Sequence, residues 1–207
     1  MIALLCQKII TGQSFHEKIK QFFIGFFVQG FIIALALCVV VSISSTTACW
    51  SCPNISAFAQ YFIFSVGIIG CNVVAEELIF RGYLLQKFSL LSTKNVACFL
   101  SAVLFALAHP YHTLGLYGIV TQAGLIGFAL AYIALYYNSI YVTIGIHLAN
   151  NVLTRAVHSG QLGILSTVET TSFSFTTIYQ LMYVSFFLLF FIYHQVWWKM
   201  KTKSLNS

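Results

Sequence analysis

Long apolar runs separated by short polar stretches make up most of this chain. They cover about 22–43, 58–86, 95–109, 115–137, 139–154 and 177–197. A run of roughly 20 apolar residues is long enough to cross a lipid bilayer as a helix. The third and fifth runs are shorter, and the fifth is the least hydrophobic, so we expect both to pack inside a bundle. The pattern therefore predicts an all-α, polytopic transmembrane helix bundle of about six spans.

Composition supports a membrane protein. Of the 207 residues, 59% are hydrophobic and 7% are charged, whereas roughly 25% of the residues of a soluble domain are charged. So few charges cannot cover a soluble surface. The length favours one domain over residues 1–207, and the polar residues of interest fall in a core at about 58–154.

The net charge of +6 predicts an orientation in the membrane rather than binding to nucleic acid. Six spans place eight lysines on one side and Arg155 on the other. The eight are Lys8, Lys18, Lys20, Lys87, Lys94, Lys199, Lys201 and Lys203. Because basic residues concentrate on the cytoplasmic side of membrane proteins, we expect both termini in the cytoplasm. A re-entrant segment near 110–118 remains an open alternative to a plain loop.

Two of the six cysteines, Cys49 and Cys52, form a C-x-x-C motif in the loop at 44–57. In an oxidising compartment they would form a small disulfide or a redox pair, and otherwise they stay free thiols. A zinc ribbon would need a second such pair, which the sequence does not contain. The state of these two cysteines is left open.

Half of the acidic residues stand side by side in an apolar segment. The chain has no aspartate and four glutamates, and Glu76 and Glu77 lie in the stretch VAEELIFRGYLL at 74–85. Glu77 and Arg81 are four residues apart, which places them on one helix face with the acid N-terminal to the base. Glu76 lies about 100° further around the helix. We therefore expect Glu77 and Arg81 to organise the helix as an ion pair, and Glu76 to point elsewhere.

Three more polar side chains fall inside predicted spans. His109 ends the third run, and His147 and Asn151 lie four residues apart in the fifth, so these two share a helix face. At 1.5 Å of rise per residue, these three side chains and Glu76 all lie roughly 12–20 Å deep. That depth is near the middle of a hydrocarbon core about 30 Å thick. We expect the four side chains to meet in one polar cavity between helices.

Such a set predicts hydrolytic chemistry and leaves two mechanisms open. A buried carboxylate can act as a general base toward water, while an imidazole holds the water and an amide donates to a developing oxyanion. Alternatively, Glu76, His109 and His147 would supply one oxygen and two nitrogens to a divalent metal such as zinc, with a fourth position for water. The same residues also suit hydrogen bonds between membrane helices or an ion or proton carrier.

Three short motifs resemble those of one intramembrane protease family. The stretches EELIFR (76–81), FALAH (105–109) and HLANN (147–151) are similar to the E-E-x-x-x-R, F-x-x-x-H and H-x-x-x-N motifs of the CPBP family. This family is also called the CAAX-processing and bacteriocin-processing, or Abi, family. The motifs occur in the family's order, while a fourth motif of the family is not evident in this chain.

The resemblance implies an intramembrane endopeptidase or metalloendopeptidase that acts, beside the lipid, on a membrane-associated peptide or small protein. Its catalytic residues would be Glu76, His109, His147 and Asn151, with Glu77 and Arg81 organising the site. The first two would activate water, and the next two would stabilise the oxyanion or assist a metal. The short chain resembles the bacterial members more, which favours the bacterial cytoplasmic membrane and a substrate other than a prenylated protein. The alternative is a non-catalytic membrane immunity or scaffold protein of the same fold.

Overall fold

The computed structural model describes residues 13–43, 47–49, 55–109, 118–158 and 166–168, with positions 116, 182, 185, 188, 191 and 192. Of the predicted sixth span at 177–197, the structure describes only positions 182, 185, 188, 191 and 192. Lys8, Cys52 and the three lysines of the tail lie outside the described residues altogether, as does nearly all of the segment at 110–118.

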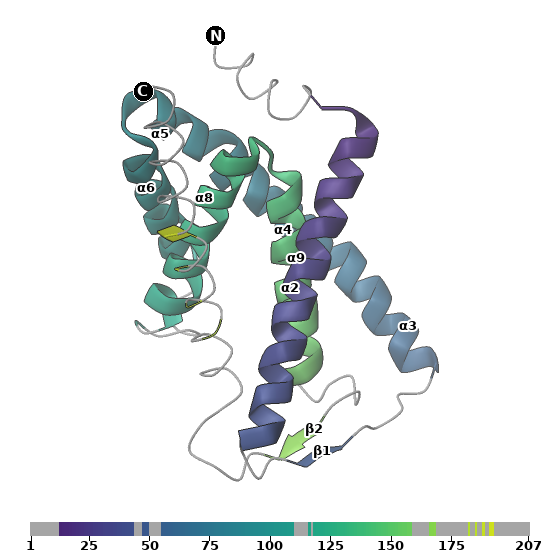
Figure 1. Ribbon diagram of the computed structural model, residues 1–207. Helices are drawn as coiled ribbons and strands as arrows, with labels where there is room; N and C mark the ends of the chain where they lie inside the picture. The colour runs from purple at the N-terminus through teal and green to yellow at the C-terminus, as the bar shows by residue number, and fades with distance from the viewer. Residues whose placement is uncertain are drawn as a thin grey trace, which may run out of the picture.

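Within the described residues the chain forms five helical rods (Figure 1). The first is α2 (Phe15–Ile43). The second joins α3 (Ile55–Phe64), η1 (Ser65–Ile69), α4 (Gly70–Glu77), η2 (Leu78–Leu84) and α5 (Leu85–Leu91), with helical backbone at the junctions. The third is α6 (Lys94–Leu107). The fourth joins η3 (Ile119–Leu125) to α8 (Ile126–Tyr137), and the fifth is α9 (Tyr141–His158). The segments η1, η2 and η3 are π-helical.

The first five predicted spans each coincide with one of these rods, so the prediction of a helical protein is confirmed. Two stretches, Phe15–Val39 and Ala59–Leu91, are long and apolar enough to cross a membrane by length and composition. Lys94–Leu107 and Ala123–Tyr137 are shorter apolar helices. The count of six spans and the cytoplasmic position of both termini remain predictions.

A short antiparallel ribbon departs from the all-α prediction. Strand β1 (Thr47–Cys49) pairs with β2 (Ser166–Val168), so that Ala48 lies opposite Thr167. Three residues are too few to show the alternating pattern by which a strand is predicted from sequence. The ribbon joins the segments that follow α2 and α9 (Figure 1).

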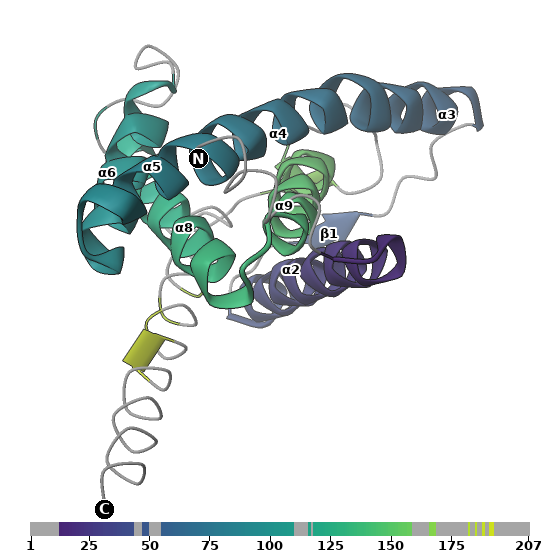
Figure 2. The ribbon, with the colours of Figure 1, turned by 90° about the horizontal axis from the view of Figure 1, so that it is seen from above.

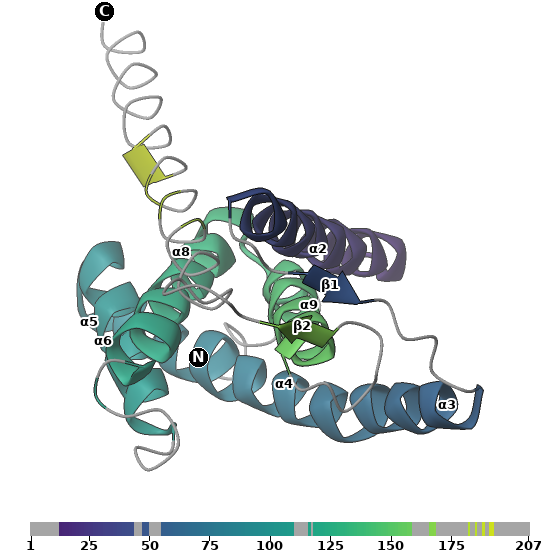
Figure 3. The ribbon, with the colours of Figure 1, turned by 90° about the horizontal axis from the view of Figure 1, so that it is seen from below.

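Helix α9 lies at the centre of the bundle. Seen from above and from below, it stands between α2 and the rod that contains α3 and α4 (Figures 2 and 3). It contacts α2, η1, α4 and α8. Residues 142–147 of α9 are buried without interruption. This placement explains why the least hydrophobic predicted span can carry polar side chains, since its neighbours shield them from lipid.

Two glycines allow α2 and α9 to cross at very short range. A Cβ atom on Gly25 of α2 would collide with the backbone oxygen of Val142, and one on Gly145 of α9 would collide with the backbone oxygen of Phe22. The two helices are therefore in backbone-to-backbone contact. Small residues commonly permit such close packing between membrane helices. Gly145 is two residues from His147, so this crossing fixes the position of the histidine.

The tight connection between α8 and α9 sets the direction of α9. Asn138 ends α8 in the left-handed conformation, with φ 49° and ψ 43°. Asparagine accepts this conformation more readily than most residues. The buried Ser139 then accepts a hydrogen bond from the backbone N–H of Tyr141 (3.2 Å). The chain reverses here, between the fourth and fifth predicted spans.

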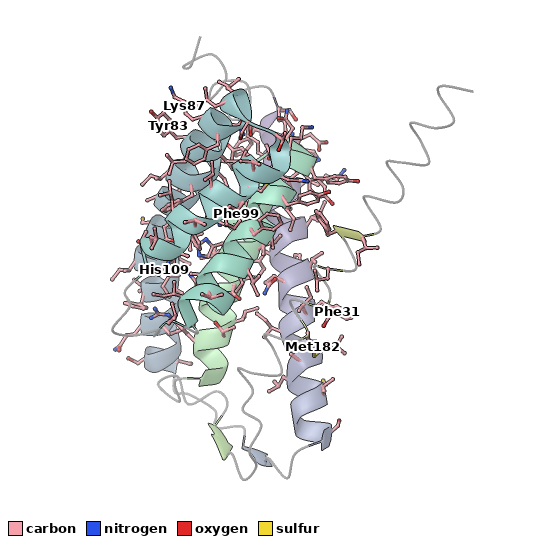
Figure 4. The ribbon with its side chains drawn as sticks, turned by 90° about the vertical axis from the view of Figure 1, so that its left-hand side faces the viewer. Phe31, Tyr83, Lys87, Phe99, His109 and Met182 are labelled. Atoms are coloured by element: carbon pink, nitrogen blue, oxygen red, sulfur yellow. The ribbon has the colours of Figure 1, made fainter. Side chains whose placement is uncertain are left out.

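The outer faces of the helices carry large apolar side chains. Among them, Phe27, Phe31, Ile63 and Leu107 are each 66–70% exposed. Phe31 projects outward from α2 in Figure 4. A soluble monomer rarely exposes large contiguous apolar patches. These faces are suited to contact with lipid.

Candidate active site

Glu77 and Arg81 form the predicted ion pair inside the bundle. The distance from Arg81 Nη1 to Glu77 Oε1 is 3.0 Å, and neither side chain is exposed. Arg81 also donates from Nη2 to the backbone oxygen of Gly127 in α8 (3.4 Å). Its guanidinium lies over the ring of Phe105, 4.1 Å from the ring centre. The arginine therefore ties η2 to α6 and α8.

His147 contacts both glutamates through different ring nitrogens. Its Nδ1 lies 2.9 Å from Glu77 Oε1, and its Nε2 lies 3.6 Å from Glu76 Oε2. Because the ionised carboxylate of Glu77 can only accept, Nδ1 is the donor. This bond fixes the orientation of the imidazole and leaves Nε2 facing Glu76. Glu77 thus binds His147 as well as Arg81. The spacing of residues predicted the contact with Arg81 but not the contact with His147.

The two carboxylate oxygens of Glu76 have different neighbours. Its Oε1 accepts a hydrogen bond from Asn72 Nδ2 at 2.6 Å. Its Oε2 is buried, faces His147 and receives no hydrogen bond from any described residue. The side chain is 23% exposed, whereas Glu77 is fully buried. The two neighbouring acids therefore sit in different environments.

A π-helical segment begins directly after the two glutamates. Segment η2 starts at Leu78 and contains Arg81. Such segments are rare and often occur at functional sites. The sequence prediction assumed a regular helix with the two acids pointing in different directions. In the structure both acids reach one imidazole, because His147 from α9 lies between them.

The ring of Phe105 connects the three motifs. Besides Arg81, it contacts the rings of His109 (4.6 Å between ring centres) and His147 (5.8 Å). It also packs edge-on against Phe80 (5.1 Å) and is 2% exposed. Gly127 leaves the space for it, since a Cβ there would lie 2.9 Å from Phe105 Cδ1. The phenylalanine thus separates and orients the two imidazoles.

His109 lies beside this cluster without a direct bond to its acids. Its Nδ1 bonds to the backbone oxygen of Phe105 (2.8 Å), so its Nε2 is the nitrogen that remains for other contacts. Figure 4 places it far along the bundle from Tyr83 and Lys87, beyond Phe99. Among the described residues, no hydrogen bond or ion pair joins it to Glu76 or His147. The structure brings Glu76 and His147 to 3.6 Å from one another, and the meeting of all four side chains stays a prediction.

Asn151 lies one helical turn beyond His147 and is half-buried. Its Oδ1 accepts a hydrogen bond from Asn150 Nδ2 (3.4 Å). Within the described part of the chain, no hydrogen bond connects Asn151 with His147 or Glu76. It shares the face of α9 with His147 but is held by its neighbour in sequence.

The side chains considered for a metal do not gather into a ligand set. No three or more His, Cys, Asp or Glu side chains among the described residues are close enough to hold a metal ion. Glu76 and His147 face one another, but His109 does not complete the group. A zinc site of Glu76, His109 and His147 therefore stays a prediction.

Sequence reasoning missed two groups that the structure adds to the site. Asn72 holds Glu76, and the spacing of four residues between them was the available signal. Phe105 was noted only as part of a motif, yet it contacts both histidines and Arg81. Its contacts with Arg81 and His147 come from two other helices, so no local pattern in the sequence could reveal them.

The central part of the chain matches a known protein family. Residues 57–153 match the family described as type II CAAX prenyl endopeptidase Rce1-like. The matched stretch contains all three motifs and runs from α3 to α9. No curated protein and no solved structure matches the chain. The match agrees with the resemblance to CAAX-processing proteases found in the sequence.

Proposed function

Residues 57–153 of this chain match the Rce1-like family of CAAX-type proteases, and on that premise we propose that the protein is an intramembrane endopeptidase. It hydrolyses peptide bonds of membrane-associated peptides or small proteins. One observation carries the proposal: the buried Oε2 of Glu76 faces Nε2 of His147 at 3.6 Å. This separation is too long for a direct hydrogen bond, and we propose that both atoms contact one water instead.

In the proposed reaction, Glu76 is the general base. A water held between Glu76 Oε2 and His147 Nε2 attacks the carbonyl carbon of the substrate, and its proton passes to Glu76. A C–O bond forms, and the carbonyl oxygen becomes an oxyanion. When the C–N bond breaks, the same proton passes from Glu76 to the leaving amine. The step consumes one water and leaves Glu76 ionised as before.

Asn151 and His109 complete the proposed site on either side of His147. An asparagine N–H directed at the developing oxyanion is worth about 10²–10³ in rate in known hydrolases. We assign this role to Asn151, which shares the buried face of α9 with His147. His109 donates from Nδ1 to Phe105, so its Nε2 is available to share the proton of the water.

Glu77, Arg81 and Phe105 serve as positioning residues. Glu77 accepts from Nδ1 of His147 and thereby directs Nε2 toward Glu76. Arg81 compensates the buried charge of Glu77 and rests on Phe105. The two adjacent glutamates thus have separate tasks, because Glu76 keeps one oxygen without a hydrogen bond from a described residue and Glu77 is sealed in an ion pair.

The mechanism predicts activity that does not depend on a bound divalent metal. The purified protein should keep its cleavage rate after dialysis against a chelator that removes zinc, with the metal content checked by mass spectrometry. The physical reason is that Glu76, His109 and His147 do not form a three-ligand cluster. Loss of activity on metal removal, with recovery on adding zinc back, would overturn this part of the proposal.

Comparative peptidomics of membranes tests the proposed function and identifies the substrate. Cells with the wild-type protein are compared with cells carrying Glu76→Gln at equal protein level. We expect a small set of membrane-associated fragments to disappear in the variant while longer precursors accumulate. Glu17→Gln, the same change at an exposed position of α2, serves as the control. Identical fragments in all three samples would favour a non-catalytic immunity or scaffold protein.

The substrate class is tested in the same material. We propose a substrate without a prenyl group, because the chain resembles the bacterial members of the family. Purified protein should cleave an apolar peptide derived from the peptidomics in its unmodified form. Cleavage only of a farnesylated or geranylgeranylated version would contradict this choice and favour prenyl processing.

A further inference from the structure

A buried glutamine lies in the long apolar helix α2. Gln29 stands midway along α2 and is 1% exposed. A buried amide is costly unless it is hydrogen-bonded. Gln29 donates from Nε2 to Oδ1 of Asn150 in α9, at 3.4 Å. This bond links α2, which lies outside the family match at residues 57–153, to the helix that carries the motif histidine and asparagine.

The bond from Gln29 is the first of two that run in one direction. Asn150 receives it on Oδ1 and donates from Nδ2 to Oδ1 of Asn151, also at 3.4 Å. Asn150 therefore accepts on its oxygen and donates from its nitrogen, and Asn151 accepts on its oxygen. The last amide, Asn151, keeps its NH₂ group, which donates to no other residue of the described part of the chain.

Hydrogen bonds that run in this direction orient the amide of Asn151 and polarise its N–H groups. Accepting a hydrogen bond on the oxygen fixes which way the amide of Asn151 faces and strengthens its N–H groups as donors, because linked hydrogen bonds reinforce one another. In the proposed reaction, that NH₂ group is the one that meets the oxyanion.

The helix crossing keeps the first bond in place. Gly25 lies one turn before Gln29 on α2, and its backbone contact with α9 leaves no slack between the two helices. Beyond the glutamine, the side chain of Leu153 reaches to 3.4 Å from the Cβ position of Gly30. Gln29 is therefore enclosed between two tight contacts of the same pair of helices.

We propose that Gln29 is a positioning residue for catalysis, which orients the amide of Asn151 through Asn150. The proposal rests on the proposed function in assigning Asn151 to the oxyanion. It assigns a defined task to α2, which supplies no motif residue.

Steady-state kinetics of Gln29→Met give the first test. Methionine keeps the length of the side chain and removes the amide. We expect kcat to fall about 3- to 10-fold, in line with the net worth of one hydrogen bond, with KM unchanged. Val28→Met, at the neighbouring position that is 42% exposed, is the control and should leave both constants unchanged. A rise in KM with unchanged kcat would overturn the proposal.

A double-mutant cycle separates positioning from packing. If Gln29 acts through Asn151, Gln29→Met should have no further effect on kcat once Asn151 is changed to alanine. If the glutamine only holds α2 against α9, its effect should be the same in both backgrounds. Equal effects in the two backgrounds would therefore refute the positioning role.

Side-chain amide NMR provides a readout that does not depend on activity. In ¹⁵N-asparagine-labelled protein in detergent, Gln29→Met should shift the NH₂ signals of both Asn150 and Asn151, assigned with single alanine variants. An unchanged Asn151 signal would refute the positioning of Asn151 by Gln29, whether or not the protein cleaves a substrate. Suppose that Glu76→Gln leaves cleavage intact while Gln29→Met does shift the Asn151 signal. The proposed function then fails, but the orientation of Asn151 by Gln29 through Asn150 stands.

Discussion

At the scale of single residues, the charges of the two glutamates explain which partners they contact. His147 donates to the sealed Glu77 and faces the partly exposed Glu76. A carboxylate without exposure needs a cation, and Arg81 supplies it. The ion pair followed from the spacing of four residues. The link from His147 to both acids did not, because it depends on where α9 lies relative to α4.

Removing Arg81 should strand a buried charge. Arg81→Ala leaves Glu77 without its cation, so we expect a loss of about 3–5 kcal/mol in the free energy of unfolding, the range for breaking one side of a buried pair. Thermal unfolding in detergent measures it, and the exposed Arg155→Ala is the control. Changing Glu77 to glutamine at the same time should restore part of the loss. Equal stability of Arg81→Ala and wild type would contradict the role of the pair.

At the scale of helices, hydrophobic runs located the rods and left their arrangement undetermined. The first five runs match α2, the α3–α5 rod, α6, η3–α8 and α9. The π-helical segments gave no signal, because hydropathy is the same whichever hydrogen bonds the backbone makes. The central place of α9 was partly predicted, since a weakly hydrophobic run favours burial. Its contact with α2 through Gly25 and Gly145 needed the structure.

The crossing of α2 and α9 should not tolerate a methyl group. In Gly145→Ala the new Cβ would press on the backbone of Phe22, and lie 2.9 Å from the backbone nitrogen of Phe26. Because backbone atoms cannot rotate away, the helices must separate and carry His147 with them. We expect a loss of about 1–3 kcal/mol in stability, typical of overpacking, together with reduced cleavage.

Another glycine provides the matched control for this crossing. A Cβ on Gly67, in η1, would meet nothing within 4 Å, so Gly67→Ala should leave unfolding in detergent and cleavage close to wild type. Equal effects of the two substitutions would show that the crossing does not position the site.

At the scale of the whole molecule, two lysine–tyrosine pairs lie at one end of the described part of the chain. The start of α2, the turn from α5 to α6 and the turn from α8 to α9 lie together at that end (Figure 1). Lys18 lies over the ring of Tyr141 (5.4 Å), and Lys87 over that of Tyr83 (5.9 Å). Tyrosine and lysine are typical of the membrane interface, and lysine of its cytoplasmic side. This end is therefore predicted to face the cytoplasm.

Labelling with a membrane-impermeant maleimide tests this orientation. In a background without native cysteines, Thr93→Cys between α5 and α6 should react only after cells are permeabilised. Ser56→Cys at the start of α3 lies at the other end of that rod and should react in intact cells; both positions are exposed. The reverse pattern would invert the predicted topology.

The central claim is that Glu76 activates the water that cleaves the substrate. Its most direct test is the single-turnover cleavage rate of the purified protein on a substrate found by peptidomics. Glu76→Gln keeps the size of the side chain and the bond from Asn72 but removes the base. The rate should fall about 10²–10⁴-fold while the protein accumulates and unfolds like wild type, and Glu17→Gln should cleave normally. A Glu76→Gln protein that cleaves at the wild-type rate would contradict the claim.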